Sequence, residues 1–311
     1  MLTELAIILT AAIFLSYSSD WLIDGASRLS RIFGISEFMI GLTIVSIGTS
    51  FPEIAVAAYS SVTGNTDLAF GNIIGSNITN IALILGASSL IRPSIIDPRI
   101  HRDAKIHVLI LAAATCFFLY NSKITRLEGV LLLLVYGLYL WDGYRRHHFV
   151  HTTAADRVRS NRKALAGPVF LIVVGAFGVF VSCNFLVDAA VGLASELAVS
   201  ATIIGLTLVA LGTSLPELAV SIAAARKNYG MMVLGNVIGS NIANILLALG
   251  IGAAIRTIPL ADGDVLVNDI VLMVFLAMAM VIFMRYRGVF DRMVGLMFIM
   301  AYAIFISMSF M

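Results

Sequence analysis

Two short segments of this chain combine hydroxyl, proline and carboxylate side chains inside apolar sequence. Residues 48–53 read GTSFPE and residues 212–217 read GTSLPE. An acid at membrane depth costs on the order of 3 kcal/mol, so it usually belongs to an ion or proton path. Neither apolar run contains a basic residue that could pair with the acid. We therefore interpret Glu53 and Glu217 as the centre of a cation-transport site.

The proline in each segment predicts a broken helix. Proline lacks an N–H and clashes with the carbonyl four residues earlier, so helices at Pro52 and Pro216 should kink or unwind and free carbonyl ligands. Hydroxyls three and four residues before each glutamate share its helix face. These hydroxyl-bearing residues are Thr49, Ser50, Thr213 and Ser214. Serine and threonine in membrane helices also serve as packing groups, so for any single hydroxyl the structural and functional interpretations stay open.

A polar stripe follows each of these segments. Asparagine and serine recur every four residues, which places them on one helix face. The stripes are Asn72, Ser76 and Asn80, then Asn236, Ser240 and Asn244. Together with the glutamates they form a set of oxygen ligands that suits Ca²⁺, Mg²⁺ or Na⁺ and disfavours zinc or copper.

The composition places these segments in a membrane. Hydrophobic residues make up 60% of the 311, charged residues 12%, and mean hydropathy is +0.99. Runs of about 20 apolar residues, enough to cross about 30 Å of hydrocarbon, recur along the chain. We predict an all-α polytopic protein with ten spans, at residues 3–23, 35–63, 67–91, 104–120, 126–143, 165–187, 199–225, 229–255, 266–284 and 288–310.

The basic residues predict the orientation. The long polar connection 144–163 carries six of the 20 lysines and arginines, which indicates a cytoplasmic loop. With that loop inside, 17 of the 20 basic residues lie inside and both termini lie outside. His147, His148 and His151 in this loop could meet at a metal, but a solvated basic linker is the preferred interpretation. The outer acidic residues Asp262, Asp264 and Asp269 are similarly attributed to turn and helix-start chemistry rather than cation capture.

The two halves of the chain are copies. At an offset of 164 residues, 11 of 17 positions match between 41–57 and 205–221, and 12 of 16 match between 71–86 and 235–250. Because each copy contains five spans, the second must enter the membrane from the opposite side. Such inverted repeats bind substrate near the midplane, on interrupted helices where the copies meet. The predicted units are 1–143, the loop 144–163, and 164–311.

At these motifs the sequence resembles the Ca²⁺/cation antiporter superfamily, and most of all the prokaryotic sodium/calcium exchangers. Both α-repeats are present, as GTSFPE with GNIIGSNITN and GTSLPE with GNVIGSNIAN. The resemblance covers essentially the whole chain and implies the ten-helix inverted fold, with the first and sixth spans sliding across the others. It also implies four adjacent ion sites at mid-membrane.

The resemblance assigns roles to particular residues. Glu53 and Glu217 hold Ca²⁺ with backbone carbonyls at Thr49 and Thr213. Asn80 and Asn244 line the centre, and asparagine at both positions argues mildly against K⁺ co-transport. The flanking Na⁺ sites are formed by Ser50, Ser76, Ser214 and Ser240, with carbonyls at Ser46 and Ala210.

The leading hypothesis is therefore antiport of Na⁺ against Ca²⁺ across the cell membrane by alternating access. Proton-coupled Ca²⁺ antiport is the alternative, because glutamates inside a membrane can carry protons themselves. A passive channel fits broken inverted repeats less well. We expect no enzyme activity, cofactor, nucleic-acid partner or obligate protein partner. Cys116 and Cys183 lie in apolar segments and are expected to pack there.

Overall fold

The computed structural model describes residues 2–64, 66–121, 123–147, 163–196, 210–259 and 264–309. His148, His151, Asp262 and the motif start at 205–207 lie outside these residues. The described residues form ten successive helical segments, and each predicted span overlaps one of them. They are α1 (Leu2–Phe33), α2 (Glu37–Ile40) to α4 (Phe51–Thr63), α5 (Thr66–Thr79) to α6 (Leu85–Ile91), α7 (His101–Tyr120), α8 (Arg126–His147), α10 (Lys163–Glu196), α12 (Ala210–Thr213) to α13 (Leu215–Arg226), α14 (Gly230–Ile242) to α15 (Leu249–Ile255), α16 (Asp264–Arg287) and α17 (Arg292–Ser309).

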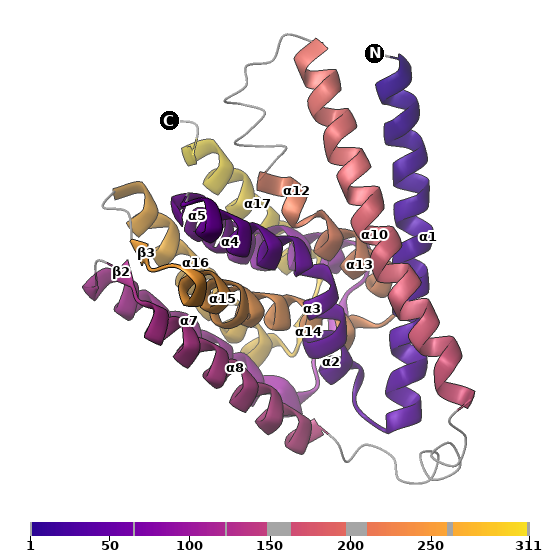
Figure 1. The fold of residues 1–311 in the computed structure, drawn as a ribbon. Helices are drawn as coiled ribbons and strands as arrows, with labels where there is room; N and C mark the ends of the chain where they lie inside the picture. The colour runs from indigo at the N-terminus through magenta and orange to yellow at the C-terminus, as the bar shows by residue number, and fades with distance from the viewer. Residues whose placement is uncertain are drawn as a thin grey trace.

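Much of this bundle is long and apolar enough to cross a membrane. Six helices of the described residues meet that test alone, and a bent pair, Glu37–Thr49 with Phe51–Thr63, makes a seventh. The termini lie at one end of the bundle, while the end of α8 and the start of α10 lie at the other (Figure 1). The chain is therefore an all-helical polytopic membrane protein apart from four two-residue strands.

The two helices that carry Glu53 and Glu217 are each broken at the residue just before the turn that contains the proline. Ser50, with φ −79° and ψ 11°, separates α3 (Ser46–Thr49) from α4, and the helix bends by 47° there. Ser214, with φ −92° and ψ 3°, separates α12 from α13 in the same way. Pro52 and Pro216 lie in the first turns of α4 and α13, where a missing N–H costs nothing. The predicted breaks are confirmed.

In the part of the chain that the structure describes, three π-helical turns interrupt the helices that carry the site. They are η1 (Gly41–Val45), η2 (Asn80–Ile84) and η5 (Ala243–Ala248). π-Helical turns are rare and occur mostly at functional sites. η2 begins at Asn80, and η5 begins one residue before Asn244, the repeat equivalent of Asn80. Both polar stripes therefore change helical pitch at their last asparagine.

The four strands connect the repeats at their edges. β1 (Ser94–Ile95) pairs antiparallel with β4 (Val289–Phe290), and β2 (Lys123–Ile124) pairs antiparallel with β3 (Ile258–Pro259). An offset of 164 residues relates β1 to β3. Each pair therefore joins one strand from each half, a pairing that helical periodicity did not predict.

Glycines allow close approach at two helix interfaces. A Cβ on Gly235 or Gly239 of α14 would lie within about 2.5 Å of backbone oxygens of Phe38 or Leu42, so these small residues let α14 approach α2 and η1 closely. A Cβ on Gly175 of α10 would lie 2.5 Å from the backbone nitrogen of Leu22. This second contact holds α1 and α10 side by side along their length (Figure 1).

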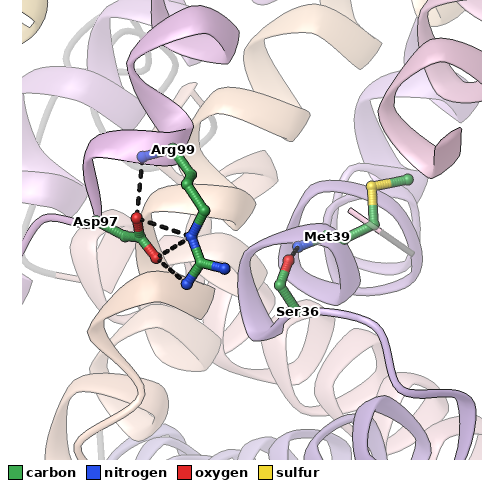
Figure 2. A network of polar contacts seen from close by, with 4 residues as sticks. All are labelled: Ser36, Met39, Asp97 and Arg99. Atoms are coloured by element: carbon green, nitrogen blue, oxygen red, sulfur yellow. Dashed lines mark hydrogen bonds and ion pairs between the residues drawn. The ribbon is translucent and has the colours of Figure 1, made fainter. Parts of the chain in front are cut away.

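Ion pairs gather at the bundle end opposite the termini. The Arg99 guanidinium lies 2.6 Å from the Asp97 carboxylate. Figure 2 shows this pair close to Ser36, whose hydroxyl accepts the N–H of Met39 at the start of α2. Lys227, after α13, lies 2.7 Å from Asp24 and 3.3 Å from Asp20 of α1. The two Lys227 contacts tie the second half of α1 to the connection between α13 and α14.

Candidate functional site

The two glutamates lie buried where the broken helices meet. Glu53 has 0% and Glu217 has 1% of its surface exposed, and each lies in the first turn after a break. Among the described residues neither carboxylate forms an ion pair with a basic group. A buried pair of acids without a basic partner is unfavourable in the absence of a cation.

Hydroxyl groups from the opposite repeat reach each carboxylate. Ser50 Oγ in the first copy donates to Glu217 Oε1 at 2.8 Å. Ser214 Oγ in the second copy donates to Glu53 Oε1 at 3.4 Å. Ser76 Oγ also lies 3.3 Å from Glu53 Oε1 and 3.1 Å from Ser214 Oγ. The crossing places both carboxylates in one site rather than in two separate ones.

Four asparagines form a second crossed set between α5 and α14. Asn80 Nδ2 donates to Asn241 Oδ1 at 2.9 Å, and Asn244 Nδ2 donates to Asn77 Oδ1 at 3.0 Å. Residues 77 and 241 are equivalent in the repeat, as are 80 and 244. The amide nitrogens of Asn80 and Asn244 are thus bonded, whereas their amide oxygens have no partner among the described residues. Asn77 and Asn241 follow Ser76 and Ser240 directly and lie off the four-residue stripe, so the spacing did not predict them.

Five buried oxygens in this region have no hydrogen-bond partner among the described residues. They are Glu53 Oε2, Glu217 Oε2, Asn80 Oδ1, Asn244 Oδ1 and Ser240 Oγ. Each unsatisfied buried polar group costs about 1–3 kcal/mol, and more when it is charged. Hard cations bind carboxylate, amide and hydroxyl oxygens, so this set has the chemistry of a Ca²⁺ or Na⁺ site.

Two further asparagines bind the threonines next to the breaks. Thr49 Oγ1 lies 3.3 Å from Asn236 Oδ1, and Thr213 Oγ1 lies 3.0 Å from Asn72 Oδ1. These bonds also cross between the repeats. They bring the first residue of each predicted stripe to the threonine of the opposite copy.

Ser46 and Ala210 contribute differently from the other predicted residues. The Ser46 hydroxyl donates to the Leu42 carbonyl of its own helix at 2.7 Å. The Ser46 carbonyl accepts the Ser50 N–H at 2.9 Å. Ala210 is the first residue of α12, and the surroundings of its side chain lie outside the described residues.

A cavity of about 310 Å³ adjoins one side of the site. It lies between α4, α10 and α13, and it is lined by Pro52, Phe180, Cys183, Gly212, Thr213 and Pro216 among others. Thr213 borders this cavity, whereas its repeat equivalent Thr49 is 1% exposed. Of the two threonines, Thr213 is therefore the one that borders this cavity.

Comparisons with known proteins agree with this arrangement. The family described as sodium/calcium exchanger protein matches residues 3–141 and 167–311. An uncharacterised membrane protein of Methanocaldococcus jannaschii is 38% identical over 96% of this chain and 95% of its own length. The sodium/calcium exchanger MaX1 of Methanosarcina acetivorans is 31% identical over 98% of this chain and 97% of its own length.

Solved structures of the sodium-calcium exchanger NCX_Mj, soaked with Na⁺, Ca²⁺ or Sr²⁺, share the fold. One of them, soaked with 10 mM Na⁺, gives a TM-score of 0.88 at 36% identity and covers 98% of both chains. The fold, the crossed carboxylates and the matched family all describe a transporter rather than an enzyme. The chain therefore belongs to the sodium/calcium exchanger family.

Proposed function

We propose that this protein exchanges Na⁺ for Ca²⁺ across the cell membrane by alternating access. The observation that carries the proposal is the crossed pair Glu53 and Glu217, which is buried, accepts hydrogen bonds from serine hydroxyls of the opposite repeat, and has no basic partner among the described residues. One Ca²⁺ balances the two carboxylates, and so do several Na⁺, so the two ions compete for one set of charges. NCX_Mj was soaked with Na⁺ alone for one structure and with Na⁺ and Ca²⁺ for another, which supports these two ions for this chain.

The proposed ligands follow from the geometry and the family. Ca²⁺ lies between Glu53 Oε2 and Glu217 Oε2, with backbone carbonyls of Thr49 and Thr213. Asn80 Oδ1 and Asn244 Oδ1 face the ions, because their amide nitrogens are already bonded. Na⁺ takes the flanking positions at Ser50, Ser76, Ser214 and Ser240, with carbonyls of Ser46 and Ala210.

We also propose that the ten helical segments cross the membrane as two inverted repeats, 1–143 and 164–311. The support is the exchange of partners at an offset of 164 residues in the Ser–Glu, Thr–Asn and Asn–Asn contacts. Both termini then lie outside, and the basic connection 144–163 lies in the cytoplasm.

Uptake of ⁴⁵Ca²⁺ into proteoliposomes tests the function. We expect uptake to require a Na⁺ gradient directed out of the vesicle and to fall at least a hundredfold in Glu53→Gln and Glu217→Gln. Glu4→Gln, which removes a carboxylate at the far end of α1, is the matched control and should transport normally. Uptake driven by a pH gradient and indifferent to Na⁺ would assign the protein to proton-coupled antiport. Uptake without any counter-ion would indicate a passive path.

A further inference from the structure

One of the differences between the two copies of the repeat changes a hydrogen bond beside the site. Residue 221 is serine, and the equivalent residue 57 is alanine. Asn236 Nδ2 donates to Ser221 Oγ at 3.0 Å. The buried Nδ2 of Asn72, the equivalent atom, has no partner among the described residues. The Asn236 amide is therefore bound at both ends, and the Asn72 amide at its oxygen alone.

This difference reaches the ions through the threonines at the breaks. Asn236 Oδ1 binds Thr49, and Asn72 Oδ1 binds Thr213. The Thr49 hydroxyl lies 3.3 Å from the Ser46 carbonyl of its own helix and 3.3 Å from Asn236 Oδ1, so the asparagine adds a contact from outside the helix. Asn236 and Thr49 are each 1% exposed, whereas Thr213 borders the 310 Å³ cavity. Asn236, the asparagine with both ends bound, therefore contacts the fully buried threonine, Thr49, rather than the threonine that borders the cavity.

We propose that Ser221 and Asn236 are positioning residues that hold the Thr49 side of the site rigid, while the Thr213 side adjusts as ions enter from the cavity. A side that is fixed before binding pays no ordering cost when the ion arrives. A side whose amide is bound at one end can rotate to follow an entering or leaving ion. This inference rests on the proposed exchange, since it assigns the threonine carbonyls to the ions.

Ser221→Ala tests the rigid side. Loss of one net hydrogen bond corresponds to about a two- to tenfold change in an equilibrium. We expect the KM for Ca²⁺ to rise by that factor while the maximal rate stays within twofold. Ser221→Thr keeps the hydroxyl and should restore the KM. The matched control is Ser61→Ala, because Ser61 is a fully buried serine of α4 whose hydroxyl has no partner among the described residues.

Ala57→Ser tests the adjustable side. α4 packs against α5 as α13 packs against α14, so a hydroxyl at position 57 can accept the free Asn72 Nδ2–H. We expect the KM for Ca²⁺ to fall and the maximal rate to drop by about two- to tenfold, because ions then leave a stiffer site. The double variant Ala57→Ser with Ser221→Ala should exchange the two sides and restore neither parameter to wild type.

Two measurements separate the possible failures. ⁴⁵Ca²⁺ binding to solubilised protein is measured beside transport, so the positioning role is tested even if the driving ion is not Na⁺. Unchanged binding and KM in Ser221→Ala would overturn the inference, even where wild-type exchange proceeds as proposed. A purely structural role would lower the thermal unfolding midpoint of Ser221→Ala without changing the KM, and it would overturn the inference too.

Discussion

Two pairs of helices related by the repeat have opposite characters. In the central pair, α5–α6 and α14–α15, 78% of the most apolar window is buried, compared with 28% in α1 and 22% in α10 of the outer pair. The central pair carries the asparagines of the site together with Ser76 and Ser240, and its helices contact the broken helices. The outer pair packs mainly on itself through Gly25, Gly175 and Gly178. Under the proposed function, the central pair supplies ion ligands and the outer pair moves against it as one unit, and this difference in burial supports that division of roles.

The largest effect is expected in the central pair at Asn244. Asn244→Leu removes an unpartnered ligand oxygen and leaves Asn77 Oδ1 without its donor. We expect Ca²⁺ binding and Na⁺-driven uptake to fall more than tenfold, as measured with ⁴⁵Ca²⁺. Asn244→Asp, which keeps an oxygen in place, should retain Ca²⁺ binding. Equal loss in both variants would count against a ligand role.

Packing in the central pair is the next test. A Cβ at Gly239 would lie 2.5 Å from the Leu42 carbonyl and 2.6 Å from Ser46 Oγ. Gly239→Val should therefore push η1 away from α14 at a cost of about 1–3 kcal/mol. We expect a lower thermal unfolding midpoint in detergent together with weaker Ca²⁺ binding. Gly137→Ala in α8, where an added Cβ meets nothing within 4 Å, is the control and should lose neither.

The outer pair should respond differently from the central pair. Gly175→Leu places a side chain against the backbone of α1 at Ser18 and Leu22. We expect the transport rate to fall several-fold while equilibrium binding of ⁴⁵Ca²⁺ stays near wild type, since neither helix supplies a ligand in the described site. Weaker binding that matched the loss of transport would contradict the division of roles between the two pairs.

The smallest effect concerns the contact between the two regions. Lys227 pairs with Asp20 and Asp24 of α1, while the repeat equivalent of Lys227 is the uncharged Thr63. Partly exposed ion pairs contribute about 0.2–1 kcal/mol. Lys227→Ala should therefore change the apparent Ca²⁺ affinity by less than about fivefold. The affinity measured from one side of the vesicle membrane should rise and the affinity measured from the other side should fall. Lys123→Ala, in strand β2, should change neither.

The sequence was sufficient to predict the breaks and most of the residues at the site. Proline and the repeated GTS triplet located both features, because proline chemistry and helical spacing act within one segment. The pairing of Ser50 with Glu217 could not be predicted, since it depends on how two segments 164 residues apart pack. Asn77 and Asn241 were missed because a π-helical turn begins near each of them and changes which side chains share a face. The strand pairs could not be predicted, because a strand of two residues is too short to show an alternating pattern.

The absence of a basic partner for the glutamates among the described residues has an electrical consequence. Two ionised carboxylates give the empty site a charge of minus two, which one divalent ion or two monovalent ions neutralise. A third monovalent ion leaves the loaded site with one positive charge, and each ion after it adds another. Moving that charge across the membrane potential involves about 2.3 kcal/mol per 100 mV. Membrane voltage therefore acts on a loaded form that carries an extra positive charge. The two acids determine how many bound ions make the loaded site neutral and thus insensitive to voltage.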